Sequence, residues 1–111
     1  MQPRTIAKLI REAAEDKKAI DPVVLDISKL TSIAHYFFVT HGASTRQVVA
    51  IAEHIVEKLR EKKKKAIHVE GLEDGKWVLI DFGSVIAHIF HRETREFYAL
   101  ERLWGEAREL K

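Results

Sequence analysis

The sequence contains no cysteine, only two prolines and five glycines, and no apolar run that approaches about 18 residues. Without cysteine the chain cannot be a disulfide scaffold. Its first residues do not follow the charged-then-apolar pattern of a secretion signal, and no stretch is apolar for long enough to span a membrane. We therefore expect a cytoplasmic protein without a membrane contact.

A strong excess of one charge is also missing, because 19 Lys and Arg residues face 17 Asp and Glu residues and leave a net charge of +2. This balance does not suit a protein that holds nucleic acid by bulk electrostatics, so any such contact should be local. The 111 residues, 46% of them apolar, suffice for a folded core without a disulfide or a metal. We expect a single domain over residues 1–111, with a flexible tail from about residue 105.

The spacing of apolar residues predicts an α/β fold with a mixed five-stranded sheet and helices mainly on one face. Two amphipathic helices are expected over residues 4–18 and 44–60, and a third helical pattern begins beyond His91. The first two strands should pair with each other, and the last two should form a hairpin. Strand, helix and strand over residues 36–70 predict a right-handed crossover with parallel pairing. The predicted strands are residues 23–27, 36–40, 67–70, 77–82 and 85–90.

The second face of this sheet should need a cover of its own. Alternation along residues 77–82 directs Val78 and Ile80 to one face and Trp77 and Leu79 to the other. Two helices of about 10 Å diameter cover only one face of a five-stranded sheet. Either the C-terminal segment or a second molecule should therefore lie on the face that carries Trp77.

Catalytic and metal-binding patterns are missing. Gly83-Ser84 between two strands imitates the signature of nucleotidyltransferases, but no predicted strand carries the paired carboxylates that two-metal phosphoryl transfer needs. The closest histidine pair, His88 and His91, has an odd spacing that sends the two side chains to opposite faces of a strand. We expect no enzyme activity, no metal and no cofactor.

The densest positive run is formed by Lys62, Lys63, Lys64 and Lys65 at the end of the second helix. One interpretation is a solvated helix end whose cations complement the negative end of the helix dipole. The alternative is an electrostatic contact with the phosphates of an RNA.

The C-terminal segment carries more apolar surface than one short helix can bury beneath itself, in Phe97, Tyr98, Leu100, Leu103 and Trp104. Trp, Tyr and Arg are enriched in binding hot spots. Part of this segment can close the open face of the sheet. We interpret the rest, together with Trp77, as a surface for a macromolecular partner.

Motifs along nearly the whole chain resemble the ribosomal silencing factor family, also called Iojap. They include LDISKLTSIA at residues 25–34 and LERLW at residues 100–104, and the remaining matches follow in the order of the family at residues 36–37, 44–48, 69–72, 75–83 and 88–98. The chain departs from the usual pattern at His35, His41 and Ala99, and Ala99 lies inside the C-terminal segment.

The resemblance implies a domain related in fold to nucleotidyltransferases but without their catalytic residues, commonly a homodimer. Members bind the large ribosomal subunit through its fourteenth protein, block joining with the small subunit and so repress translation when nutrients are scarce. Organelle relatives act in large-subunit assembly. Matched motifs place the contact at Trp77, Tyr98, Leu100, Glu101 and Trp104. The aromatic side chains and the leucine would fill apolar pockets, and Glu101 would pair with a basic residue of the partner. A local contact between Lys62–Lys65 and ribosomal RNA stays open.

Overall fold

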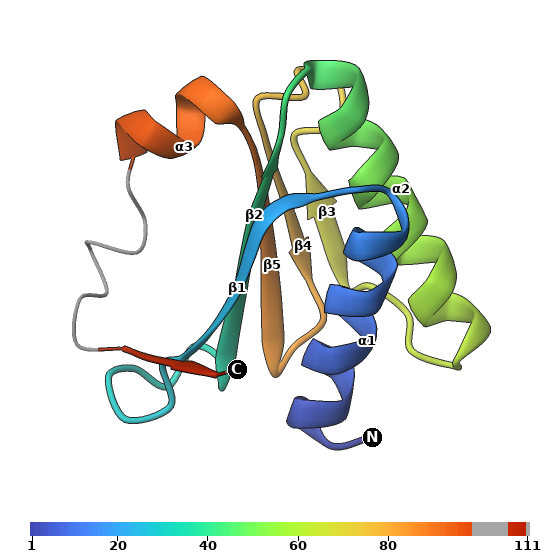
Figure 1. The fold of residues 1–111 in the computed structure, drawn as a ribbon. Helices are drawn as coiled ribbons and strands as arrows, with labels where there is room; N and C mark the ends of the chain where they lie inside the picture. The colour runs from blue at the N-terminus through green and yellow to red at the C-terminus, as the bar shows by residue number, and fades with distance from the viewer. Residues whose placement is uncertain (99–106, 111) are drawn as a thin grey trace.

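The computed structural model describes residues 1–98 and 107–110, apart from the side chains of residues 96–98 and 108 (Figure 1). Helices α1 (Pro3–Asp16) and α2 (Thr45–Glu61) cover one face of a sheet, and α3 (Arg92–Tyr98) lies on the opposite side. Within the described residues the sheet has six strands, which are β1 (Ile20–Asp26), β2 (Tyr36–Gly42), β3 (His68–Glu70), β4 (Trp77–Asp81), β5 (Val85–His91) and β6 (Arg108–Leu110).

The predicted α/β class and the mixed sheet are confirmed, but the count of five strands is wrong. The strand order is β3-β4-β5-β2-β1-β6, with β2 and β5 parallel and the other neighbours antiparallel. The additional strand, β6, falls within the stretch from about residue 105 that we expected to be a tail. A strand of three residues is too short to show a period of two, and its conformation follows from pairing with the edge of β1.

The pairing predicted for the crossover is also wrong. Strand β3 pairs with β4, and the parallel partner of β2 is β5. The length and burial of β5 explain this difference, because its seven residues are mostly buried, whereas the three residues of β3 are exposed or half-buried. The predicted pairing of β1 with β2 and the β4–β5 hairpin are confirmed.

The larger core lies between the sheet and the two long helices. Helix α1 buries Ile6 and Ile10 together with Ala13 and Ala14, whose small side chains let α1 approach its neighbours closely. Helix α2 begins at the N-cap Ser44, whose side chain accepts a hydrogen bond from the Gln47 backbone N–H (3.1 Å). Within the described residues, no helix is long and apolar enough to cross a membrane.

A second, smaller core lies on the other face of the sheet, and the predicted alternation in β4 is confirmed by it. Val78 and Ile80 belong to the core under the helices, whereas Trp77 packs against the second core. Ala107 also packs there, and α3 contacts β5 and β2. The C-terminal part of the chain therefore contributes to the cover that this face requires. The buried members of the second core are Leu25, Ile27, Ala34, Phe37, Val39 and Phe90.

Candidate partner-binding site

The side chain of Trp77 is half-buried at the start of β4 and packs on aromatic neighbours. Its ring centroid lies 4.9 Å from that of Phe90 and 6.0 Å from that of His88. The ring centroids of Phe37 and His88 lie 4.7 Å apart in an edge-to-face arrangement, and the rings of His88 and Phe90 are stacked, with an angle of 12° between their planes. We call Phe37, Trp77, His88 and Phe90 the aromatic cluster. It leaves one part of the indole accessible and holds the remainder in a fixed position.

A hydrogen bond fixes the orientation of the indole. Trp77 Nε1 donates to His88 Nδ1 at 3.2 Å, and an indole N–H can only donate. His88 Nδ1 must therefore be unprotonated, and the neutral ring carries its proton on Nε2. Nε2 is buried and has no hydrogen-bond partner in the described part of the chain. Burial lowers the pKa of His88 to about 4, so the ring is neutral near pH 7.

The backbone before Trp77 depends on a glycine. Gly71 has a φ of +90°, and a Cβ at this position would overlap the carbonyl oxygen of Trp77. Gly75 N–H donates to the Gly71 carbonyl at 2.9 Å, and Gly75 itself lies against Thr45 in the first turn of α2. The turn over residues 71–75 is thus packed between the start of α2 and the start of β4.

A cleft of about 500 Å³ lies beside Trp77. Its wall carries charges of both signs, one from the cation Lys76 and two from the carboxylates of Asp74 and Glu93. Such a cleft can accept a polar side chain of a partner next to the apolar indole. The lining residues are Thr45, Gly71, Asp74, Lys76, Trp77, His91, Glu93 and Thr94.

Helix α3 is fastened to the sheet by Arg95. The Arg95 Nη1 atom donates to the Asp21 carbonyl at 2.8 Å and to the Ile20 carbonyl at 3.4 Å, and it lies 2.9 Å from His41 Nδ1. Because a guanidinium can only donate, His41 Nδ1 is the acceptor. His41, one of the departures from the family pattern, therefore has a definite contact: it helps to position the helix that ends at Tyr98.

The predicted site is described only in part. The structure places the Trp77 side chain, and the backbone of Tyr98 lies at the end of α3. Leu100, Glu101 and Trp104 lie outside the described residues, as does the side chain of Tyr98, so the proximity of these residues to Trp77 stays a prediction.

The lysine run lies at the opposite end of α2 from the Trp77 cleft. Helix α2 begins at Thr45, which lines the cleft, and ends at Glu61, immediately before Lys62. Its 17 residues correspond to about 25 Å. Lys62, Lys63 and Lys65 are exposed, and the backbone of residues 62–64 closes the helix with hydrogen bonds to the carbonyls of Leu59 and Arg60. Among the described residues, no cluster of three or more metal-ligating side chains is present.

Sequence reasoning did not identify the residues that position the site, namely Gly71, His88 and Arg95. His88 is a diagonal neighbour of Trp77, because Trp77 pairs with Phe90 and Leu79 pairs with His88. That relation becomes visible only when the register of the hairpin is known. A glycine six residues before Trp77 was a usable signal for Gly71, since glycine marks positions of positive φ.

Comparison with known proteins accounts for the whole chain. The sequence model of the family described as "Ribosomal silencing factor during starvation" matches residues 1–111. The chain belongs to the ribosomal silencing factor family. Among its relatives, the ribosomal silencing factor RsfS of Bacillus subtilis is 39% identical over 107 residues, which cover 96% of this chain and 91% of the relative. The RsfS protein of Chromobacterium violaceum is 43% identical over 105 residues, covering 95% and 86%.

The fold of this chain closely matches the fold of solved structures. A crystal structure of a Chromobacterium violaceum protein has a TM-score of 0.93 at 43% identity and covers 95% of this chain and 88% of its own. An organelle relative is more distant: the mouse "Mitochondrial assembly of ribosomal large subunit protein 1" is 32% identical over 91 residues, which are 79% of this chain and 40% of that protein. Ribosome binding and translation repression follow from membership of the family.

Proposed function

We propose that this chain binds the large ribosomal subunit through its fourteenth ribosomal protein and sterically blocks joining with the small subunit. Translation in the cytoplasm would then be repressed under nutrient limitation. The observation that carries the proposal is the family match over residues 1–111, and the half-exposed Trp77 on a rigid aromatic support agrees with it. Aromatic side chains that are fixed before binding lose little entropy when they enter a pocket of the partner.

The proposed contact consists of Trp77, Tyr98, Leu100, Glu101 and Trp104. Trp77 would insert its accessible edge into an apolar pocket, and the polar cleft beside it would receive a neighbouring side chain. Glu101 would pair with a basic residue of the ribosomal protein. Lys62–Lys65 would add a local contact with ribosomal RNA, and the free protein would be a homodimer.

Co-sedimentation of the purified chain with isolated large subunits tests the contact. Trp77→Ala should weaken binding by roughly 30-fold, the equivalent of about 2 kcal/mol for a hot-spot residue. Ile67→Ala is the matched control, because Ile67 is 69% exposed and follows the lysine run at the far end of α2. Its affinity should equal that of the unmodified chain. Binding by Trp77→Ala at unchanged affinity would remove Trp77 from the contact.

No catalytic step is proposed. The carboxylate of Asp81, on which a nucleotidyltransferase-like alternative would depend, accepts a hydrogen bond from the Gly83 N–H in the β4–β5 turn at 2.7 Å. This bond supports a role in the turn. Calorimetry with nucleoside triphosphates and Mg²⁺ that gave a signal dependent on Asp81 would contradict the proposal.

A role in large-subunit assembly is the second candidate, favoured by the name of the mouse relative. Both roles would use the same surface. They differ in what a deletion strain accumulates: a silencing factor leaves mature large subunits, whereas loss of an assembly factor leaves immature particles on a sucrose gradient.

A further inference from the structure

A cleft of about 690 Å³ lies where α1, as far as Arg11, meets β1 and β6. Its residues Val24 and Leu110 pack on the core under the helices, whereas Trp77 packs on the core of the other face. Its floor is apolar and its rim is basic, and the described residues that line it include no carboxylate. We call it the α1 groove. It is lined by Gln2, Arg4, Thr5, Ala7, Lys8, Arg11, Val24 and Leu110.

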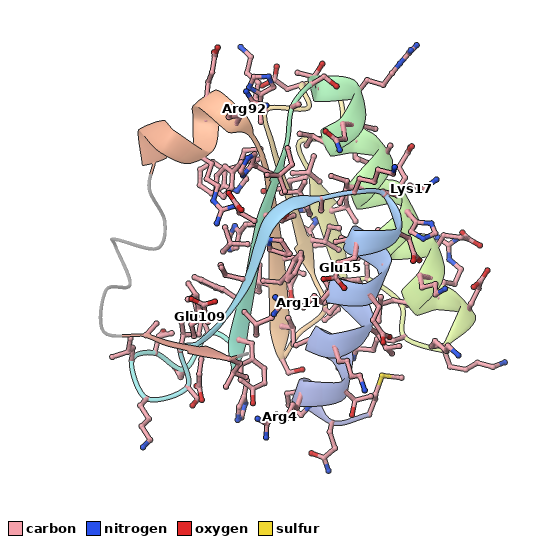
Figure 2. All side chains as sticks on the ribbon, viewed as in Figure 1. Arg4, Arg11, Glu15, Lys17, Arg92 and Glu109 are labelled. Atoms are coloured by element: carbon pink, nitrogen blue, oxygen red, sulfur yellow. The ribbon has the colours of Figure 1, made fainter. Side chains whose placement is uncertain are left out.

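Three cations lie in a row along this groove. Arg4, Lys8 and Arg11 are spaced four and three residues apart, which places them on one side of the helix. Figure 2 shows Arg4 and Arg11 on the side of α1 that faces β1, and Arg11 Nη2 reaches the Pro22 carbonyl at 3.4 Å. The successive rises along the helix axis are about 6 Å and about 4.5 Å.

The start of α1 offers no stabilising partner for a positive charge. The first turn of α1 contains no acidic residue, and the side chain of the N-cap Gln2 makes no capping hydrogen bond. Arg4 lies in this first turn, where a cation opposes the helix dipole. Among the described residues the only ion pair made by the three is a 3.8 Å contact between Arg11 and Glu15. The lysines at the end of α2 differ, because there the helix dipole itself favours positive charge.

We propose that the α1 groove binds the phosphate backbone of RNA. One strand of RNA presents a row of single negative charges, which a row of Arg and Lys side chains can neutralise, while Gln2 and Thr5 can donate hydrogen bonds to phosphate oxygens. The apolar floor formed by Ala7, Val24 and Leu110 suits the carbon atoms of ribose. A net charge of only +2 agrees with a local contact of this kind.

The groove is close in sequence to the proposed protein contact. Leu110 lines the groove and lies six residues beyond Trp104. Six residues of extended chain reach about 20 Å. One particle that holds the contact segment over residues 100–104 can therefore present RNA to the groove. The inference in this form rests on the proposed function, with the RNA of the large subunit as the ligand.

The test compares two triple variants with the same change in charge. Arg4→Gln/Lys8→Gln/Arg11→Gln removes the row, and Lys17→Gln/Lys18→Gln/Lys29→Gln removes three exposed lysines outside the groove. Binding to purified large subunits is measured between about 50 and 200 mM salt. The groove variant should reduce the slope of log affinity against log salt by about 2, as expected for three phosphate contacts on a single strand, and the control should keep the original slope. Equal slopes for the two variants would overturn the inference.

Two further measurements separate the remaining outcomes. If the same loss of slope is found with the isolated fourteenth ribosomal protein, the ligand is an acidic protein segment and the RNA assignment is wrong. A labelled single-stranded RNA oligonucleotide tests the groove without the ribosome, and the groove variant should bind it more weakly than the control. If the unmodified chain fails to bind large subunits, the proposed function is wrong. The oligonucleotide result still shows whether the α1 groove binds RNA. The thermal midpoint of each triple variant is measured as a folding control, because replacing Arg11 also removes its contacts with Glu15 and the Pro22 carbonyl.

Discussion

The position of Trp77 depends on the protonation state of one histidine. His88 accepts the indole N–H only while its Nδ1 is unprotonated, and at 5% exposure it gains a proton with difficulty. Between pH 6.5 and about 4 the unfolded chain binds a proton at His88 that the folded chain does not bind. The contribution of neutral His88 to the free energy of unfolding is therefore fully present above pH 6.5 and is lost as the pH falls toward 4.

Replacing His88 removes this acid dependence. A pKa lowered from 6.5 to about 4 corresponds to a loss of about 3 kcal/mol of unfolding free energy once the pH is below 4. His88→Phe keeps a ring between Phe37 and Phe90 and has nothing to titrate. Urea denaturation at pH 7, 5 and 4 should give a free energy that falls more steeply for the unmodified chain than for the variant. Parallel pH profiles would show that His88 does not titrate in this way.

Gly71 should be essential to the placement of Trp77. Alanine at positive φ costs about 1–2 kcal/mol, and at Gly71 the added Cβ also overlaps the Trp77 carbonyl. Gly83→Ala is the matched control, because Gly83 has a φ of +89° and its Cβ would meet only the flexible end of Ile67 at 3.3 Å. Gly71→Ala should lower the thermal midpoint further than Gly83→Ala and weaken binding to large subunits. Equal effects of the two substitutions would contradict the close packing of Gly71 on β4.

At the scale of elements, Arg95 holds the helix that leads into the contact segment. Arg95→Met keeps the length of the side chain and removes the donors to the Asp21 and Ile20 carbonyls and to His41. Amide hydrogens of α3 should exchange faster in this variant, and binding to large subunits should weaken. Arg92→Met provides the comparison within α3, because Arg92 is exposed. If the amide hydrogens of α3 exchange at the same rate in Arg95→Met and in Arg92→Met, Arg95 does not fasten α3.

Elements with a regular pattern of apolar residues were predictable from the sequence, whereas the short strand β6 and the parallel partner of β2 were missed. The stripe of α2 and the alternation of β4 follow from burial against the core, so periodicity finds them. Strand β6 and the β2–β5 pairing depend on neighbours that are distant in the sequence. The same division holds for the site. Alternation assigned Trp77 to the second face, whereas its contacts with His88 and Gly71 depend on register and backbone conformation.

For the whole molecule, the proposed contacts with the ribosome are spread over separate surfaces. The Trp77 cleft and the lysine run lie at opposite ends of α2, and the α1 groove lies where α1 meets the β6 edge of the sheet. A balanced net charge keeps each electrostatic contact local. Binding would then combine an aromatic contact with the ribosomal protein, which sets position, and phosphate contacts, which respond to salt.

The most direct test of the central claim is a subunit-joining assay. Purified small and large subunits are mixed with increasing amounts of the chain, and the whole-ribosome peak is measured by sedimentation. We expect this peak to fall, with the chain sedimenting on free large subunits, and we expect Trp77→Ala to have much less effect than Ile67→Ala, which should act like the unmodified chain. A whole-ribosome peak that stays unchanged while large subunits are saturated with the chain would contradict steric block of joining.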